Sequence, residues 1–339
     1  LPRFDQGAVV MKVITNEEPA LMPKIYVIYE NQAWLEPMAA VLDQQGVPWS
    51  GWDFSDGAFD LAAEPPRGIF YNRMSASAHT RGHHHSPEYA AGVLAWLERH
   101  GRRIVNGSDV VDLEISKIRQ YAVLEKAGIA IPRTLAVLGR HRLAEAARRG
   151  FGDGPVILKP NRGGKGLGVQ LFQNLEALAA YAEGAAYEEP IDGINLLQEY
   201  IPAPEPFITR AEFVGGRFLY ALRVDTSAGF ELCPADACAV DDAFRPVGEE
   251  ASESRPRFEI IPDIDADLKA AYERFLAENR IELAGIEFIV RADGRIFTYD
   301  LNTNTTYNPD AERAAGQSGM QAVAAFLAAE LRRLYPASQ

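Results

Sequence analysis

Short apolar runs alternate with helical patterns over the first hundred residues of the chain. Four runs rich in β-branched and aromatic residues are typical of strands, and they lie at residues 24–30, near Val47, at 68–71 and at 103–105. Two amphipathic segments between them predict helices over residues 35–45 and 87–100, with Gly46 and Gly101 as stop signals. Alternation of this kind is typical of a parallel sheet covered by helices. The pattern predicts a small parallel α/β lobe that ends near residues 107–108.

The remainder of the chain has a different texture. Residues 109–127 read as one helix, which Gly128 terminates. Further strands are expected at residues 155–160, 168–172, 196–201, 210–214, 217–224, 285–290 and 295–302, and further helices at 174–183, 265–279 and 320–334. Gly-Gly at 215–216 and Asp-Gly at 293–294 are turn signals of β-hairpins, so we expect this half to be mainly antiparallel.

Composition narrows the class of protein. With 339 residues, 47% of them hydrophobic and 24% charged, the chain fits an ordinary globular protein of two or three lobes. Its net charge of −13 would repel a phosphate backbone, so nucleic acid is not expected as a partner. We find no apolar run of membrane-spanning length and no secretory leader, which predicts a cytoplasmic protein that does not insert into membranes.

Two cysteines, Cys233 and Cys238, are too few for a disulfide framework. We interpret them as free thiols, although their spacing could be bridged or could bind metal in principle. The residues before Met22 show no clear periodicity and are left out of the predicted fold.

The strongest local signal is a glycine-rich loop between two predicted strands. A strand ends at Lys159, and the loop that follows contains Gly163, Gly164, Gly166 and Gly168. Glycines let backbone N–H groups approach phosphate oxygens closely. The loop is not a P-loop, and because a strand follows it, it is not a dinucleotide fingerprint either. The alternative is a glycine-rich hairpin without a catalytic role.

A second signal is a set of oxygen ligands on two predicted strands joined by a short turn. Glu287 lies in the first strand, and Asp300 and Asn302 lie two residues apart in the second, so they share a face. Hard oxygen ligands of this kind suit magnesium held with nucleotide phosphates. The alternative is that Asp300 and Asn302 merely open a loop. A weaker third signal is the strand 197–201 (LQEYI), whose backbone could face an adenine edge.

In this order the signals resemble the ATP-grasp superfamily, and most closely its glutamate-ligase-like (RimK-like) branch. The resemblance covers about residues 105–334. It implies an α/β (α+β) ATP-grasp fold with a pre-ATP-grasp domain at residues 1–108. A central lid subdomain with a linker helix is expected at 109–200 and a C-terminal subdomain at 201–339, the two clasping ATP.

The resemblance also implies roles for individual residues. The nucleotide-binding set is Lys117, Lys159, Gly163, Gly164, Lys165, Gly166, Gly168, Gln198, Glu199 and Ile201, with Glu205 as the ribose ligand. Glu287, Asp300 and Asn302 match the metal set, which would hold one or two Mg²⁺ ions, with Mn²⁺ as a substitute. Arg210 and Arg223 match the catalytic cations around the transferred phosphate, although they could instead be paired charges on a sheet face.

Substrate residues are expected at two further places. Arg73, His79 and Arg81 follow a strand of the first lobe, at the sheet edge where open α/β sheets bind ligands. They suit a carboxylate, and the alternatives are a solvated loop or, with the histidines at 83–85, a metal site. The acidic residues Glu231 and Asp236 are expected to bind an ammonium group, and Asn304 belongs to an amide-rich stretch after the metal set.

These observations predict an ATP-dependent carboxylate–amine ligase that forms an amide bond through an acyl-phosphate, with an amino acid such as glutamate as one substrate. The alternatives are an ATP-binding regulatory protein without ligase activity and a D-alanine–D-alanine-like dipeptide ligase. The expected partners are small amino-acid or peptide substrates, and a homodimer is left open.

Overall fold

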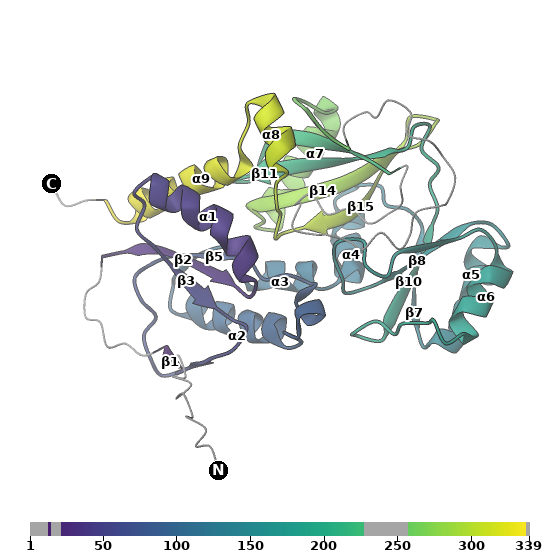
Figure 1. The fold of residues 1–339 in the computed structure, drawn as a ribbon, viewed down its shortest axis with the longest axis horizontal. Helices are drawn as coiled ribbons and strands as arrows, with labels where there is room; N and C mark the ends of the chain where they lie inside the picture. The colour runs from purple at the N-terminus through teal and green to yellow at the C-terminus, as the bar shows by residue number, and fades with distance from the viewer. Residues whose placement is uncertain (1–12, 15–21, 227–256, 337–339) are drawn as a thin grey trace, which may run out of the picture.

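The computed structural model describes residues 13–14, 22–226 and 257–336, which form three lobes around one cleft (Figure 1). The first lobe is a parallel sheet, as its alternating pattern predicted. Its order is β3-β2-β5-β6, from Trp49–Asp53, Lys24–Tyr29, Gly68–Asn72 and Arg103–Val105. The two-residue strands β1 (Val13–Ile14) and β4 (Ala58–Phe59) pair beside it.

Helices cover both faces of the parallel sheet because its strands are apolar on both sides. On one face α1 (Gln32–Gln44) packs through Leu35 and Met38. On the other, α2 (Ser86–Arg99) packs through Val93 and Leu94. The C-terminal helix α9 (Gly319–Leu334) lies beside α1 on the first face, so the end of the chain completes the core of the beginning.

The second lobe is an antiparallel sheet of order β7-β10-β8-β9. Its strands are Thr134–Leu138, Ile194–Glu199, Val156–Pro160 and Gln170–Phe172. Helices α5 (Leu143–Phe151) and α6 (Leu175–Glu183) cover one face and leave the other toward the cleft. The sequence pattern did not predict β7 or α5, because β7 buries only Val137 and has no alternation to detect.

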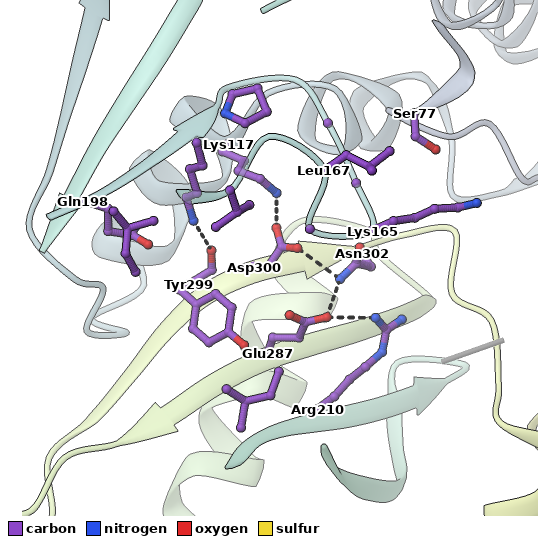
Figure 2. Close-up of a pocket in the computed structure, with 18 of the residues that line it drawn as sticks. Ser77, Lys117, Lys165, Leu167, Gln198, Arg210, Glu287, Tyr299, Asp300 and Asn302 are labelled. Atoms are coloured by element: carbon purple, nitrogen blue, oxygen red, sulfur yellow. Dashed lines mark hydrogen bonds and ion pairs between the residues drawn. The ribbon is translucent and has the colours of Figure 1, made fainter. Parts of the chain in front are cut away.

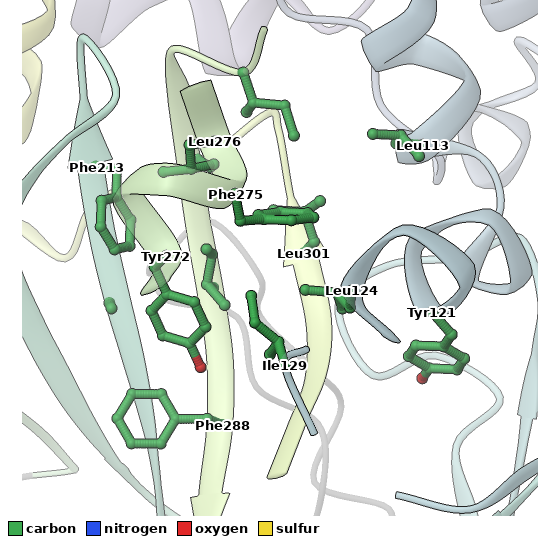
Figure 3. Packing of buried hydrophobic residues seen from close by; sticks show 14 of the residues in the cluster. Leu113, Tyr121, Leu124, Ile129, Phe213, Tyr272, Phe275, Leu276, Phe288 and Leu301 are labelled. Atoms are coloured by element: carbon green, nitrogen blue, oxygen red, sulfur yellow. The ribbon is translucent and has the colours of Figure 1, made fainter. Parts of the chain in front are cut away.

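The third lobe is a five-stranded antiparallel sheet of order β13-β12-β11-β14-β15. Its strands are Phe258–Ile261, Arg217–Asp225, Phe207–Val214, Leu283–Val290 and Ile296–Asn302. Helix α7 (Ala266–Glu278) covers one face through Tyr272 and Phe275, where the linker helix α4 (Lys117–Lys126) also packs (Figure 3). The opposite face of β11, β14 and β15 lines the cleft. The short helix α8 (Pro309–Ala315) follows β15, and the sequence predicted neither α8 nor β13.

The linker predicted as one helix over residues 109–127 is two helices, α3 (Ser108–Glu114) and α4 (Lys117–Lys126). The break has a local cause, because the Ser116 side chain accepts a hydrogen bond from the Arg119 backbone N–H and so caps a new helix. The cap places Lys117 in the first turn of α4, at the cleft. Among the described helices, none is both long enough and apolar enough to cross a membrane.

Candidate active site

One cleft, with an empty volume of about 1340 Å³, lies where the three lobes meet. The first lobe contributes Trp34, Ser75 and Ser77 to its wall, the second contributes Lys159 and Gln198 among others, and the third contributes Glu287 and Asp300. In Figure 2, Gln198 lies at one side, Ser77 and Lys165 lie at the other, and the carboxylates lie between them. The cleft therefore has two distinct ends on either side of a charged centre.

The centre is built by the β14–β15 hairpin. Glu287 and Asp300 are direct cross-strand partners, and Asn302 lies two residues further along the same face. The Asn302 amide donates to Glu287 Oε1 at 3.3 Å and to Asp300 Oδ2 at 3.4 Å. Burial raises the pKa of Glu287, and the charge of Asp300 raises it further. Burial also disfavours the charge on Asp300, but the ammonium groups of Lys117 and Lys159 outweigh it and lower the pKa of that carboxyl.

Two largely buried carboxylates on paired strands repel each other, so the site favours a cation between them. The Asp300 carboxylate forms an ion pair with Lys117 Nζ in this structure. Two carboxylates and one amide oxygen are hard ligands of the type that Mg²⁺ takes together with substrate phosphates. Nowhere in the described residues do three or more His, Cys, Asp or Glu side chains form a metal-binding group. The donor set fits a magnesium ion that also binds a phosphate.

Two lysines face this centre from different lobes. Lys117 comes from the start of α4, and Lys159 comes from β8. Lys159 Nζ donates to the backbone oxygen of Tyr299 at 3.3 Å and lies 5.4 Å from the centre of the Tyr121 ring. Burial and then the charge of Lys117 lower the pKa of Lys159 to about 7. The ammonium groups of Lys117 and Lys159 therefore lie together in the cleft, where a polyanion could bind them.

Arg210 on β11 is held rigidly beside the carboxylates. Its Nε donates to Glu212 at 2.6 Å, Nη1 donates to Glu287 at 2.9 Å and Nη2 donates to Thr305 at 2.6 Å. A Cβ at Gly285 would lie 2.6 Å from Arg210 Nε, so only glycine lets the guanidinium lie against this strand. Burial disfavours the charge, but the two carboxylates reverse that effect and raise the pKa of Arg210.

The glycine-rich loop covers the cleft and contacts the first lobe. Lys165 Nζ lies 4.7 Å from the centre of the Trp34 ring, and Arg162 Nη1 donates to Glu88 at 2.6 Å. An ion pair at the start of the loop and a cation–π contact at its middle thus attach the loop to the first lobe. The members of the loop that line the cleft are Gly163, Gly164, Lys165, Gly166 and Leu167. Gly166 and Gly168 have φ angles of 74° and 73°, which favour glycine.

The end of the cleft near Gln198 is mostly apolar. Ile157, Ile201, Ile208 and Ile289 line it together with Gln198 and Glu199. Gln198 donates to Tyr121 Oη at 3.0 Å and to Thr134 Oγ1 at 2.9 Å, which fixes its amide. An apolar site with hydrogen-bonding edges suits a flat heteroaromatic ring.

The overall fold is similar to that of a known group of solved structures. A RimK domain ATP-grasp protein from Sphaerobacter thermophilus superposes with a TM-score of 0.61 over 89% of this chain and 98% of its own, at 17% identity. The ATP-grasp ligase PsnB in complex with its minimal precursor, Mg and ADP superposes with a TM-score of 0.62 over 92% and 99%, at 17% identity. This chain has the ATP-grasp fold. The fold predicted from the sequence is confirmed.

The relatives found by sequence align with a smaller part of this chain than the solved structures do. No family model matches the chain. A probable alpha-L-glutamate ligase of Pseudoalteromonas atlantica is 28% identical over 144 residues, which is 42% of this chain and 46% of that protein. A D-alanine–D-alanine ligase of Ectopseudomonas mendocina is 28% identical over 229 residues, 64% of this chain and 65% of that protein. The chain thus aligns with about half to two thirds of the length of these relatives.

Two of the predicted nucleotide and phosphate residues lie away from the ATP-grasp cleft. Arg223 is exposed, because β12 places Leu222 opposite Arg210 and alternation turns Arg223 to the other face of the sheet. There its guanidinium lies 4.8 Å from the centre of the Phe207 ring. Glu205 lies beside a separate small cavity next to Phe207 and is not part of the cleft wall. The structure therefore does not bring Arg223 to the centre formed by Glu287 and Asp300, and the expectation for it is corrected.

Some of the predicted substrate residues lie at the cleft and others lie away from it. Asn304 lines the cleft, and Arg73 lies directly behind that wall. Arg81 binds the buried carboxylate of Glu30 through Nε at 3.1 Å, and His79 contacts the backbone oxygen of Ala76 at 3.1 Å, so both are occupied outside the cleft wall. Glu231, Asp236, Cys233 and Cys238 lie outside the described residues.

Several wall residues were not predicted as site residues. Ser75 and Ser77 lie in the loop that contains the predicted Arg73, and Trp34 precedes the helix expected over residues 35–45. Glu114 is a partly buried carboxylate that accepts hydrogen bonds from the backbone N–H groups of Ala76 at 3.2 Å and Thr303 at 2.8 Å. Burial raises its pKa. It joins loops from two lobes, a role that only the folded chain reveals.

Proposed function

We propose that this chain is an ATP-dependent carboxylate–amine ligase that forms an amide bond through an acyl-phosphate. The observation that carries the proposal is the order of groups along one cleft. An apolar end is followed by buried lysines and a glycine-rich loop, then by the Glu287–Asp300–Asn302 set, and then by a polar end. Solved structures of the same fold hold Mg and ADP, or ATP, and the relatives in sequence are named as ligases of glutamate and D-alanine.

ATP fits the cleft in one direction. Its adenine belongs at the apolar end, against Gln198, Glu199 and Ile201. Its phosphates then reach Lys117 and Lys159, under the loop of residues 163–168. This assignment pairs the buried ammonium of Lys159, which has no ion-pair partner among the described residues, with a phosphate group. Glu205 lies away from the cleft wall, so we do not assign it to the ribose.

Magnesium belongs at Glu287, Asp300 and Asn302, where it would neutralise charge on the phosphates. The donor set can serve one ion or two, and Mn²⁺ accepts the same ligands. Arg210 lies next to this set, bonded to Glu287. Its fixed position supplies positive charge without any rearrangement during the reaction.

The reaction has two balanced steps. A carboxylate oxygen of the first substrate attacks the γ-phosphorus of ATP, the bond to the β-phosphate oxygen breaks, and ADP leaves. The amine nitrogen of the second substrate then attacks the acyl carbon, phosphate leaves, and the ammonium proton passes to solvent. Lys117, Lys159 and Arg210 hold the transferred phosphoryl group, and the closed loop excludes water that would hydrolyse the acyl-phosphate.

The experiment is a phosphate-release screen with ATP and magnesium, using the twenty amino acids, D-alanine and glutamate-terminated peptides, singly and in pairs. We expect release that requires a carboxylate and an amine together. The Asp300→Asn variant should be inactive, whereas Asp293→Asn, an exposed aspartate in the turn of the same hairpin, should match the parent. ATP binding with no release for any pair would favour a regulatory nucleotide-binding protein instead. Release with paired D-alanine alone would favour a dipeptide ligase.

A further inference from the structure

The polar end of the cleft has hydrogen-bond donors that no protein group uses. Six buried side-chain polar atoms among the described residues lack a hydrogen-bond partner. Two of them, Arg73 Nη2 and Asn304 Nδ2, belong to residues that contact each other, and a third, Tyr307 Oη, is close enough for the Arg73 charge to affect its pKa. A buried donor without an acceptor costs about 1–3 kcal/mol, so this cluster indicates a missing acceptor.

Arg73 is also unusual in its charge. It is only 3% exposed, and among the described residues it has no carboxylate within ion-pair distance. Other buried basic residues do have one, since Lys117 pairs with Asp300, Arg162 with Glu88, and Arg210 with Glu212 and Glu287. Lys159 is the other buried cation without such a partner, and it faces the position proposed for phosphate. The Arg73 guanidinium lies 5.9 Å from the centre of the Tyr71 ring, but a buried cation without a carboxylate partner still favours an anionic ligand nearby.

Arg73 is hydrogen-bonded to two residues that line the cleft. Its Nη1 donates to the backbone oxygen of Trp34 at 2.5 Å, and its Nε donates to Asn304 Oδ1 at 3.3 Å. Both Trp34 and Asn304 line the cleft. A guanidinium can only donate, so the oxygen of the Asn304 amide must face Arg73 and its nitrogen must face elsewhere. Arg73 thereby orients Asn304 as a donor and places a positive charge behind it.

Hydroxyl groups also lie at this end, together with the Glu114 carboxylate, which accepts hydrogen bonds from the backbone N–H groups of Ala76 and Thr303. Ser75, Ser77 and Thr306 add hydroxyl groups to the wall beside Trp34 and Asn304. This end lies beyond the carboxylate centre when viewed from the proposed adenine site (Figure 2). A substrate that meets the γ-phosphate from this side would extend into the wall formed by Trp34, Ser75, Ser77, Asn304 and Thr306, which we call the donor wall.

We infer that the donor wall binds a carboxylate that does not react, so that at least one substrate is an amino acid or peptide with a free carboxylate besides the group that is joined. Asn304 contacts that carboxylate, and Arg73 is a positioning residue that orients Asn304 and supplies charge. The inference rests on the proposed function for the orientation of the substrate. Its chemistry, a carboxylate at donors without acceptors, can be tested without turnover.

The decisive variant is Asn304→Asp. Aspartate has the same shape and keeps an oxygen toward Arg73 Nε, so it should pair with Arg73 and preserve the fold. It replaces the amide donor with an acceptor and cancels the local positive charge. Asn174→Asp makes the same change at the N-terminal cap of α6, away from the cleft wall, where aspartate caps as well as asparagine. It is the matched control.

Binding is measured by thermal shift and then by calorimetry, with magnesium and a non-hydrolysable ATP analogue present. The probes are the twenty L-amino acids and D-alanine, each with its carboxamide, which keeps the amine and removes the charge. We expect the parent to bind at least one acid more tightly than its amide. The Asn304→Asp substitution should lower the affinity for that acid by about 10- to 100-fold, the range for a hydrogen bond to a charged group. Asn174→Asp should behave like the parent.

The two proposals fail separately. If no acid binds the parent more tightly than its amide, the donor wall does not bind a carboxylate. If the parent prefers the acid to its amide and Asn304→Asp shows the same preference, an ordered water satisfies these donors and the inference is overturned. If discrimination is lost in Asn304→Asp while no pair releases phosphate, the donor wall is correct and the proposed ligase activity is wrong. Arg73→Met should raise KM for the acid while leaving KM for ATP unchanged, and an equal change in both would make Arg73 merely structural.

Discussion

Replacing Arg210 with methionine should destabilise the third lobe in a pH-dependent way. The Arg210 side chain lies between Glu212 and Glu287, at 6%, 2% and 12% exposure. Methionine fills a similar volume but leaves two buried carboxylates without their cation. Removing one partner of a buried ion pair costs about 3–5 kcal/mol. With a urea m-value of about 3 kcal/mol/M, the midpoint should fall by about 1–2 M at pH 8.

The pH dependence follows from the direction of the pKa shifts. Burial raises the pKa of Glu212 above the ordinary value of 4.5, and burial followed by Asp300 does the same for Glu287. Arg210 opposes both shifts, so its loss raises both pKa values further. A carboxyl whose pKa is higher in the folded state favours folding at low pH, and that contribution is lost as pH rises through the folded pKa. The deficit of Arg210→Met should therefore be largest at pH 8 and shrink toward pH 5.

The assay is urea denaturation followed by far-UV circular dichroism at pH 8 and pH 5.5. Arg217→Met is the control on the same hairpin, because Arg217 is 79% exposed and pairs with Glu273 at the surface. Exposed pairs contribute about 0–1 kcal/mol, so this variant should shift the midpoint little at either pH. A cost for Arg210→Met below about 1 kcal/mol, or one that is equal at both pH values, would refute the reasoning.

Three further predictions concern the nucleotide. Lys159→Ala should weaken ATP binding and abolish turnover, and calorimetry that finds unchanged affinity would contradict the assignment. Because the pKa of Lys159 is about 7, its positive charge is lost as pH rises, so ATP affinity should fall between pH 6 and 8. Lys159→Arg stays charged and should flatten this dependence of ATP affinity on pH. If the parent and Lys159→Arg show the same dependence, the lysine does not titrate in this range. ATP should protect the loop from trypsin at Arg162 and Lys165, because nucleotide beneath it favours the docked position; equal cleavage rates with and without ATP would argue against a lid.

The sequence predicted the elements whose patterns are local. The Gly-Gly and Asp-Gly turns predicted the hairpins, and the alternating strands and helices predicted the parallel lobe. The sequence pattern did not predict elements that bury few residues. Strand β7 is an edge strand with one buried residue, and α5 and α8 are short helices that bury only two residues each. Such elements exist because the rest of the fold holds them.

The site was predictable to the extent that its residues lie on regular elements. Cross-strand register carried Glu287, Asp300 and Asn302 to one point, as their spacing predicted. Register also explains the error with Arg223, because a shift of one residue along a strand reverses the face. The contact between Arg73 and Asn304 joins residues 231 positions apart in the chain, in loops whose course no local pattern defines.

The measurement that tests the ligase proposal most directly is the transfer of oxygen from the carboxylate substrate to phosphate. A carboxylate substrate from the screen is labelled with ¹⁸O and turned over with ATP, magnesium and the amine, and the released phosphate is analysed by mass spectrometry. If the carboxylate attacks the γ-phosphorus, one carboxylate oxygen must leave with each phosphate when the amide forms. The account predicts one labelled oxygen per phosphate released in amide formation, and phosphate without label would contradict the acyl-phosphate.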